Sequence, residues 1–290
     1  MVMRESPEVN LFIIGAMKSG TTSLHNYLAT HPDIFMCEPK EPGFFVEELT
    51  WAKGLDWYRS LFADAQGKAV VGESSTHYTK LPVYRGVPER IAEFNPNARF
   101  IYLMRDPVDR AVSHYWHNVR DLTSGRERRD MLTAMQRDPQ YVAFSDYAMQ
   151  LKPYMEIFGR ERIFVATFER MVADPAGVVG EIFSWLRVDG SFQPEDLHRR
   201  WNAAPEELSR VRGLGILNRI RYSRAWDRLA PAMPGRLRRL GIFLAEKPVG
   251  RASQDETAAQ RYLRPILRGR VEEIRSLLGR DFNEWITLYR

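Results

Sequence analysis

The sequence predicts an α/β fold with a central parallel sheet flanked by helices. A run of five apolar residues at 11–15 has no polar alternation, which is the pattern of a strand buried on both faces. Similar apolar runs alternate with helical patterns over residues 10–190, as expected for parallel strands joined by right-handed crossovers. The length of 290 residues is enough to bury a large core without disulfides or metals.

The predicted elements follow one another in a regular order. Strands are expected at 11–15, 69–72, 99–104 and 162–166. Helices are expected at 23–30, 87–94, 108–120, 145–158, 176–186 and 257–278, the last broken or kinked near Pro265. Residues 120–140 and 199–256 predict loops or irregular structure. We expect one domain over 1–290, with a core at 10–190, a basic segment at 199–256 and a C-terminal helix at 257–290.

Composition excludes several classes of protein. The mean hydropathy is −0.40, and no apolar run approaches the roughly 20 residues of a membrane span. The first eight residues lack the apolar core of a signal peptide, so secretion by that route is not expected. Cys37 is the only cysteine, which excludes an internal disulfide and a thiolate-rich metal site. The histidines show no metal-ligand spacing. We therefore expect a cytoplasmic protein without a metal.

The positive charge is concentrated in one part of the chain. Lys and Arg total 42 against 37 acids, a net charge of +5, and the pI is near 9.3. Residues 199–251 hold thirteen basic residues against four acids, a net +9, which leaves −4 for the rest. Such a basic segment indicates an anionic partner, which could be nucleic acid, a membrane surface or a small molecule.

A glycine-containing turn, Gly-Ala-Met-Lys-Ser-Gly-Thr-Thr at 15–22, joins the first strand to the first helix. Such a turn directs backbone N–H groups and the positive helix end at an anion. Lys18 adds a cation, and Thr21 and Thr22 add hydroxyl donors. The order differs from the Gly-x-x-x-x-Gly-Lys-Ser/Thr of nucleotide triphosphatases. We expect a phosphate or sulfate site here without an obligatory metal; the alternative is an ordinary capped turn.

A second candidate anion site begins at the end of the third predicted strand. Arg105 stands at the carboxyl end of that strand, where open α/β sheets bind ligands. Asp106 suits the N-cap and Pro107 the first position of the next helix. Ser113 lies eight residues beyond Arg105, about two helical turns on. A guanidinium can hold a phosphate through two parallel hydrogen bonds, although a structural salt bridge would use the same residue.

Together these two segments resemble the 3'-phosphoadenosine 5'-phosphosulfate (PAPS)-dependent sulfotransferases, especially the heparan-sulfate-type branch and bacterial sulfotransferase domains. In that family a Lys-x-Gly-Thr-Thr loop binds the 5'-phosphosulfate, and an Arg-Asp-Pro segment with a later Ser binds the 3'-phosphate. The resemblance implies a P-loop-like nucleotide-binding architecture and PAPS as the donor. The matching positions here are Lys18, Ser19, Gly20, Thr21, Thr22, Arg105 and Ser113.

Other segments extend the resemblance over roughly residues 10–290. Residues 38–45 are similar to the family's Lys-Glu-x-x-Phe-Phe segment, 72–75 to its Glu-Lys-Ser/Thr segment and 277–285 to its C-terminal helix. Residues 246–251 stand where relatives have a basic loop that closes over the 3'-phosphate, which adds Lys247 and Arg251 to the candidate donor-binding residues.

Sulfuryl transfer needs a cation at the leaving oxygen and a base for the acceptor proton. Lys18 is the candidate cation. The resemblance implies Glu41 as the base. His77 is a rival, because it follows the second predicted strand and an unperturbed imidazole suits proton transfer near neutral pH. Ser74 stands where heparan-type relatives carry a Lys, which speaks against a sulfated-polysaccharide acceptor.

The sequence thus predicts a sulfotransferase that moves a sulfuryl group from PAPS to a hydroxyl, or an amine, of a glycan, glycolipid or small molecule. One alternative is another nucleotide-binding protein or a small-molecule kinase, which would need the Walker order that is absent. Another is nucleic-acid binding by residues 199–251, where no recognisable module is present and which we do not expect. That segment fits a lid, a peripheral membrane contact or a solvated basic face.

Overall fold

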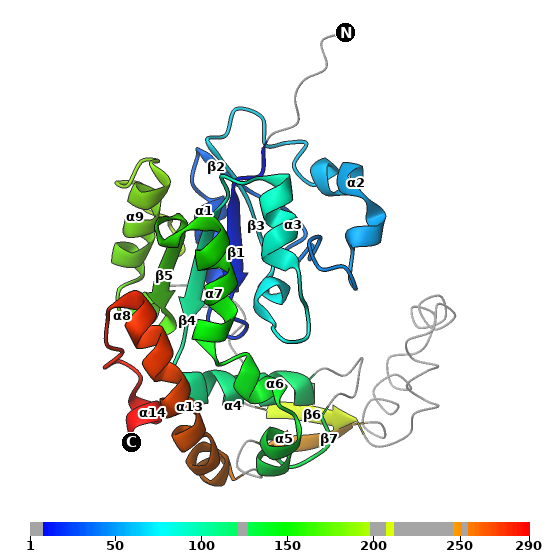
Figure 1. Cartoon of the computed structure of the whole chain (residues 1–290), viewed down its shortest axis with the longest axis vertical. Helices are drawn as coiled ribbons and strands as arrows, with labels where there is room; N and C mark the ends of the chain where they lie inside the picture. Colours follow the sequence, from blue (N-terminus) through cyan, green and yellow to red (C-terminus); the bar gives the residue numbers. More distant parts are fainter. Residues whose placement is uncertain (1–7, 121–126, 198–206, 212–245, 251–254) are drawn as a thin grey trace, which may run out of the picture. The chain divides into compact units, whose positions relative to one another are not determined.

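The structure is a computed structural model that describes residues 8–120, 127–197, 207–211, 246–250 and 255–290 (Figure 1). Contacts within the chain define two compact units. The first comprises Met1–Ala111, Pro139–Ala203 and Leu263–Arg290, and the second comprises Val112–Asp138 and Ala204–Tyr262. This division does not test the single-domain prediction. The candidate site is described within the first unit.

The first unit is built on a five-stranded sheet. Its strands are β1 (Leu11–Gly15), β2 (Ile34–Met36), β3 (Val70–Ser74), β4 (Arg99–Met104) and β5 (Ile163–Thr167). They lie in the order β2-β3-β1-β4-β5, and all four neighbouring pairs are parallel. The predicted fold class is therefore confirmed, and the four predicted strands are found within one or two residues of their expected bounds.

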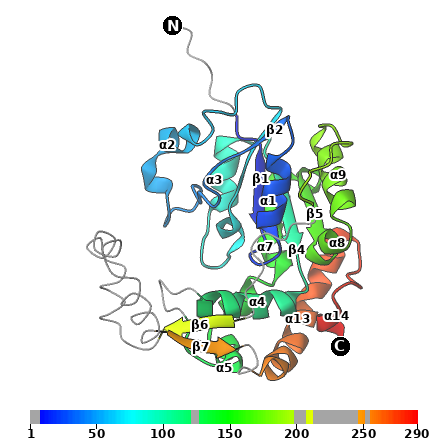
Figure 2. The ribbon, with the colours of Figure 1, turned by 180° about the vertical axis from the view of Figure 1, so that it is seen from behind.

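Helices cover both faces of this sheet (Figures 1 and 2). Helices α1 (Thr21–Ala29) and α9 (Pro175–Leu186) share one buried apolar cluster with Leu11 and Ile13 of β1. Helices α3 (Val87–Phe94) and α7 (Tyr147–Phe158) lie on the other face, where Phe12 stacks on Phe100 at 5.7 Å. Because β1 is buried on both faces, its sequence shows an unbroken apolar run.

The strand order creates a switch point beside β1. The chain leaves β3 on one side of β1 and later enters β4 on its other side. In parallel sheets of this kind, ligands bind at the carboxyl ends of the strands where the order reverses. The turn after β1 and Arg105 after β4 both lie at this edge.

The remaining described elements include the long helix α13 (Glu256–Leu278), which begins in the second unit and continues in the first. They are α2 (Leu55–Ser60), α4 (Pro107–Arg120), α5 (Met131–Arg137), α6 (Gln140–Ala143), α8 (Phe168–Ala173), α13, α14 (Ile286–Tyr289), the 3-10 turns η1 (Trp51–Lys53), η2 (Thr76–Thr79) and η3 (Arg160–Arg162), and the antiparallel pair β6 (Glu207–Val211) and β7 (Glu246–Gly250). Within the described ranges, no helix is both long and apolar enough to cross a bilayer.

Some local predictions were wrong. Helix α13 is continuous from Glu256 to Leu278, so the helix is not broken at Pro265, which lies between the buried Leu263 and Leu267; a kink there stays a prediction. Helix α5 lies in the range 120–140 that was expected to be loop-rich, and β6 and β7 lie in the range 199–256.

Candidate active site

The turn after β1 leads directly into α1 and contains two residues with positive φ. Lys18 has φ 72° and Gly20, the N-cap residue, has φ 88°. A Cβ at Gly20 would lie 2.9 Å from the ring of Phe168, so a larger residue does not fit. Gly20, as the N-cap residue, provides no side-chain hydrogen bond to the start of α1. The hydroxyl of Ser19 is buried and has no hydrogen-bond partner there.

The glycine that ends β1 is required by close packing. A Cβ at Gly15 would lie 2.3 Å from Thr79 Oγ1 and 2.7 Å from the ring of Tyr102. Thr79 Oγ1 itself donates to the carbonyl of Ile14 at 2.5 Å. The segment after β3 therefore packs directly against the end of β1, which fixes where the turn begins.

Arg105 meets this turn. Its Nη1 donates to the carbonyl of Lys18 at 3.3 Å, and its guanidinium lies 4.9 Å from the ring centroid of Phe168. The structure thus brings together the two segments that the sequence singled out, 87 residues apart. Lys18, in the turn after β1, and Arg105, directly after β4, therefore lie together at the switch point of the sheet.

Three predicted donor-binding residues lie outside the described part of the first unit. Ser113 lies in α4, in the part of that helix that belongs to the second unit. Lys247 lies in β7, of which only the backbone is described, and Arg251 lies outside the described residues. Their roles in donor binding stay predictions.

The predicted base Glu41 lies in a dense set of hydrogen-bond donors. Its backbone N–H donates to the carbonyl of Ser74 at 2.9 Å, which ties its loop to the end of β3. Its carboxylate accepts from the backbone N–H of Thr76 at 2.8 Å and from Lys40 Nζ at 2.5 Å. His77 Nδ1 lies 3.3 Å from Glu41 Oε2. The two rival bases are therefore neighbours.

These contacts determine the charge of Glu41. Burial alone would raise the pKa of Glu41, but the adjacent His77 and the charge of Lys40 outweigh it and lower that pKa to about 2. Glu41 is therefore a carboxylate throughout the neutral range and a weak proton acceptor by itself. The Glu41 carboxylate can orient the His77 ring through Nδ1 and stabilise the protonated imidazolium form of that ring.

Sequence reasoning missed a second histidine beside these residues. His25 lies on α1, and its Nδ1 is 2.8 Å from the hydroxyl of Ser74. Burial, with a contribution from the charge of Lys40, lowers the pKa of His25 to about 4, so the ring is neutral near pH 7. The available signal was spacing: His25 follows Thr21 by four residues and thus shares its helix face. Lys40 is likewise a nearby cation that the sequence analysis left without a role.

Behind the site lies a buried carboxyl group, Glu73 of β3. Its Oε1 accepts hydrogen bonds from the hydroxyls of Tyr58 at 2.8 Å and Tyr78 at 2.6 Å, and its Oε2 accepts from Ser75 at 2.6 Å. Ser75 Oγ in turn accepts the N–H of Gly43 at 2.9 Å, two residues after Glu41. Burial raises the pKa of Glu73 to about 7, although its three hydrogen bonds act in the opposite direction.

This raised pKa predicts a pH-dependent effect of Glu73→Gln. The folded protein disfavours the ionised carboxyl, so stability that is present below about pH 4.5 is lost as the pH rises towards 7. Gln does not titrate. The unfolding free energy of Glu73→Gln minus that of wild type should therefore be about 3 kcal/mol larger at about pH 8 than at about pH 4.5, as measured by urea denaturation.

A matched control is Glu47→Gln, since the side chain of Glu47 is 73% exposed. Its difference from wild type should not change with pH. If the difference between Glu73→Gln and wild type is also the same at both ends of this pH range, the buried carboxyl does not titrate as described.

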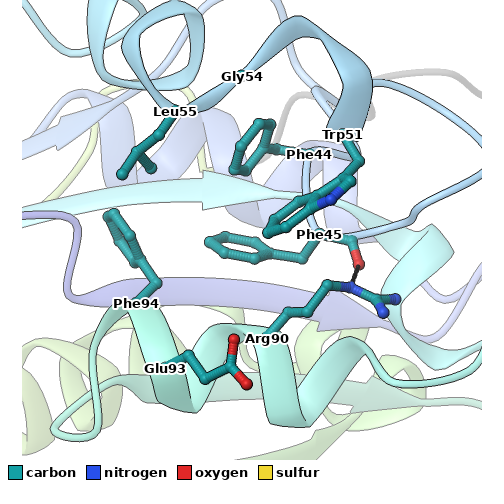
Figure 3. A pocket seen from close by; sticks show the side chains of 8 residues that line it. All are labelled: Phe44, Phe45, Trp51, Gly54, Leu55, Arg90, Glu93 and Phe94. Atoms are coloured by element: carbon teal, nitrogen blue, oxygen red, sulfur yellow. Dashed lines mark hydrogen bonds between the residues drawn. The ribbon is translucent and has the colours of Figure 1, made fainter.

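Two cavities lie within the first unit. A cavity of about 720 Å³ opens beside Arg105. Its lining includes Phe168, Glu169 and Arg170, and also Arg280, Glu284 and Ile286 near the end of the chain. A separate cavity of about 380 Å³ lies between α3 and the segment at 44–55, where the rings of Phe44, Phe45, Trp51 and Phe94 enclose it (Figure 3). Arg90 borders the second cavity and donates to the Phe45 carbonyl at 2.8 Å.

Within the described residues, no group of three or more His, Cys, Asp or Glu side chains is arranged to hold a metal ion.

Comparison with known proteins places this geometry in a family. The profile of the sulfotransferase domain matches residues 8–205, more than half of the chain, so the chain belongs to the sulfotransferase family. Human heparan sulfate glucosamine 3-O-sulfotransferase 6 is 31% identical over 179 residues, which are 60% of this chain and 51% of that protein. Mouse heparan sulfate glucosamine 3-O-sulfotransferase 3B1 is 30% identical over 180 residues, which are 60% of this chain and 45% of that protein.

The chain spans about half the length of these curated relatives. Among solved structures, a sulfotransferase from Alicyclobacillus acidocaldarius matches with a TM-score of 0.68 at 26% identity and covers 96% of this chain and 99% of its own. The resemblance drawn from the sequence motifs is therefore confirmed at the level of family and fold.

Proposed function

We propose that this protein transfers a sulfuryl group from PAPS to a hydroxyl, or to an amine, of an acceptor molecule. Membership of the sulfotransferase family supports the reaction class. The observation that carries the proposal is the contact between Arg105 Nη1 and the Lys18 carbonyl at 3.3 Å. It joins the two cationic residues that would hold a doubly phosphorylated nucleotide at the uncapped start of α1.

The residues of the turn fit such a donor. The buried Ser19 hydroxyl lacks a partner among the described residues, as expected of a group that serves a ligand. Lys18, Thr21 and Thr22, with the backbone of the turn, would hold the 5'-phosphosulfate, and Arg105 would hold the 3'-phosphate. When bound, PAPS supplies the sulfuryl group and a stable leaving phosphate. Lys18 would neutralise the charge that grows on the bridging oxygen.

The pair of Glu41 and His77 would manage the acceptor proton. The Glu41 carboxylate faces His77 Nδ1, so the remaining ring nitrogen, Nε2, is the one that can accept a proton from the attacking hydroxyl. Glu41 would orient the ring and stabilise its charged form. The alternative within the same pair is direct proton transfer to Glu41, which its low pKa disfavours.

The acceptor class is also part of the proposal. The curated relatives are named for 3-O-sulfation of glucosamine in heparan sulfate, which supports a hydroxyl-bearing glycan. Ser74, hydrogen-bonded to the neutral His25, leaves this part of the site without the Lys of heparan-type relatives. We therefore propose an acceptor less anionic than heparan sulfate, which includes glycolipids and small hydroxyl compounds. A cytoplasmic location stays a prediction.

Donor binding is tested by calorimetry with 3'-phosphoadenosine 5'-phosphate (PAP), the product that keeps both phosphates. Wild-type protein should bind PAP, and Arg105→Ala should weaken binding about tenfold or more because a charge-assisted contact to phosphate is lost. Arg59→Ala, which removes an exposed arginine on α2, is the matched control and should bind like wild type. Absence of binding to wild type at about millimolar PAP, on the order of the weakest affinities that calorimetry detects, would refute the donor assignment.

A further inference from the structure

The last eleven residues of the chain contact the turn that carries Arg105. The backbone N–H of Leu288 donates to Asp106 Oδ2 at 2.8 Å, across 182 residues of sequence. The other carboxylate oxygen of Asp106 accepts from the N–H of Val108 at 3.0 Å and so caps α4. The side chain of Asp106, the residue directly after Arg105, therefore bonds both the start of α4 and the C-terminal segment.

A second connection runs through Tyr147 of α7. Its hydroxyl donates to the Arg105 carbonyl at 2.6 Å and accepts the Arg105 N–H at 3.3 Å. The ring of Tyr147 lies 5.7 Å from that of Trp285, which is fully buried and stacks on Phe282 at 4.1 Å. Both backbone polar groups of Arg105 are thus engaged by a side chain that rests on the C-terminal segment.

The segment is itself anchored to the rest of the first unit. Thr167 at the end of β5 donates through Oγ1 to Glu284 Oε1 at 2.9 Å. From α13, Arg264 Nε donates to the Thr287 carbonyl at 2.8 Å and Arg268 Nε to the Leu288 carbonyl at 2.9 Å. These bonds fix the position of Leu288, whose N–H donates to the Asp106 carboxylate.

We propose that the C-terminal segment from Arg280 to Arg290 is a positioning element for the candidate donor site, acting on Arg105 through Tyr147 and Asp106. This inference rests on the proposed function. Both connections end on the two residues of the turn itself, where they fix the backbone from which the guanidinium reaches the Lys18 carbonyl. A guanidinium must be held in one orientation to bind a phosphate through paired hydrogen bonds.

Two variants separate this role from general stability. Tyr147→Phe keeps the ring against Trp285 and removes the hydroxyl that holds the Arg105 backbone. Asp106→Ser keeps an oxygen that can cap α4 but removes the acceptor of the Leu288 N–H. The matched control is Tyr27→Phe, which removes a hydroxyl that donates to the Leu197 carbonyl at 2.9 Å.

The first measurement needs no ligand. Hydrogen exchange of the amides in the segment from Arg105 to Asp109 should be about fivefold faster or more in Tyr147→Phe and Asp106→Ser, and unchanged in Tyr27→Phe. The second measurement is donor binding and turnover. Both variants should bind PAP about fivefold more weakly and raise the KM for PAPS in proportion, with kcat at saturating donor within about twofold of wild type.

The outcomes are distinct. If exchange in this segment is unchanged in both variants, the inference is wrong whatever the ligand does. Faster exchange with unaltered PAP affinity also refutes it, since the segment would then be structural only. If wild-type protein does not bind PAP, the proposed function fails together with the donor-site role, and the exchange data still decide whether the segment holds the Arg105 turn.

Discussion

Lys18→Met should lower kcat about 10²- to 10³-fold while the fold is preserved. The ammonium group is the candidate cation for the oxygen that leaves with PAP, and a charge that is felt most in the transition state affects kcat more than substrate binding. Methionine has a similar length and shares the cost of the φ of 72° at this position, so the loss reports the charge and not backbone strain. The measurement is steady-state transfer from labelled PAPS at saturating donor.

The matched control is Lys68→Met, which removes an exposed ammonium that donates to the Pro32 carbonyl. It should leave kcat unchanged within about twofold, as surface substitutions usually do. A Lys18→Met enzyme with wild-type kcat would show that another group neutralises the leaving oxygen, and Lys40, which contacts Glu41, would be the first to test.

Glu41→Gln should reduce kcat about 10²-fold or more and leave PAP affinity unchanged. The amide keeps the size of the side chain, but it cannot stabilise an imidazolium at His77 or accept a proton itself. His77→Asn should cause a loss of similar size, and the double variant should lose little more than either single variant, because the two residues act as one unit. Each variant is compared by kcat at saturating donor and by calorimetry with PAP.

The pH profile distinguishes the two proton acceptors within this pair. A carboxylate with a pKa of about 2 stays ionised across the working range, so direct transfer to Glu41 predicts no acid limb above about pH 4. An acid limb that is present in wild type and absent from His77→Asn assigns the proton to the imidazole. Full activity of Glu41→Gln would remove Glu41 from the mechanism altogether.

The sheet could be predicted because its strands carry strong local signals. Residues 11–15 and 100–104 are runs without a charged residue, and burial on both faces of a parallel sheet produces that pattern. Strand β2 was missed because three residues, Ile-Phe-Met, are too few to show any period. In the antiparallel pair of β6 and β7, Arg210 lies opposite Lys247, 37 positions later in the sequence, and no local pattern reveals a pairing at that separation.

The candidate site likewise contains residues that local sequence could predict and contacts that it could not. Lys18 and Arg105 were found because each lies within a few residues of a strand end, and the strand order then brings them together. The pairing of Glu41 with His77, by contrast, depends on the Glu41 loop bonding to Ser74 through its backbone, which no residue spacing encodes. The C-terminal contact with Asp106 is a hydrogen bond across 182 residues of sequence, a separation that no local pattern reveals.

The most direct test of the donor site is a crystal structure of this protein with PAP bound. We expect the 5'-phosphate at the turn of residues 16–22, with Lys18 and Ser19 in contact, and the 3'-phosphate within about 3 Å of the Arg105 guanidinium. Clear density for PAP at another surface, with Arg105 still directed only at the Lys18 carbonyl, would contradict this expectation.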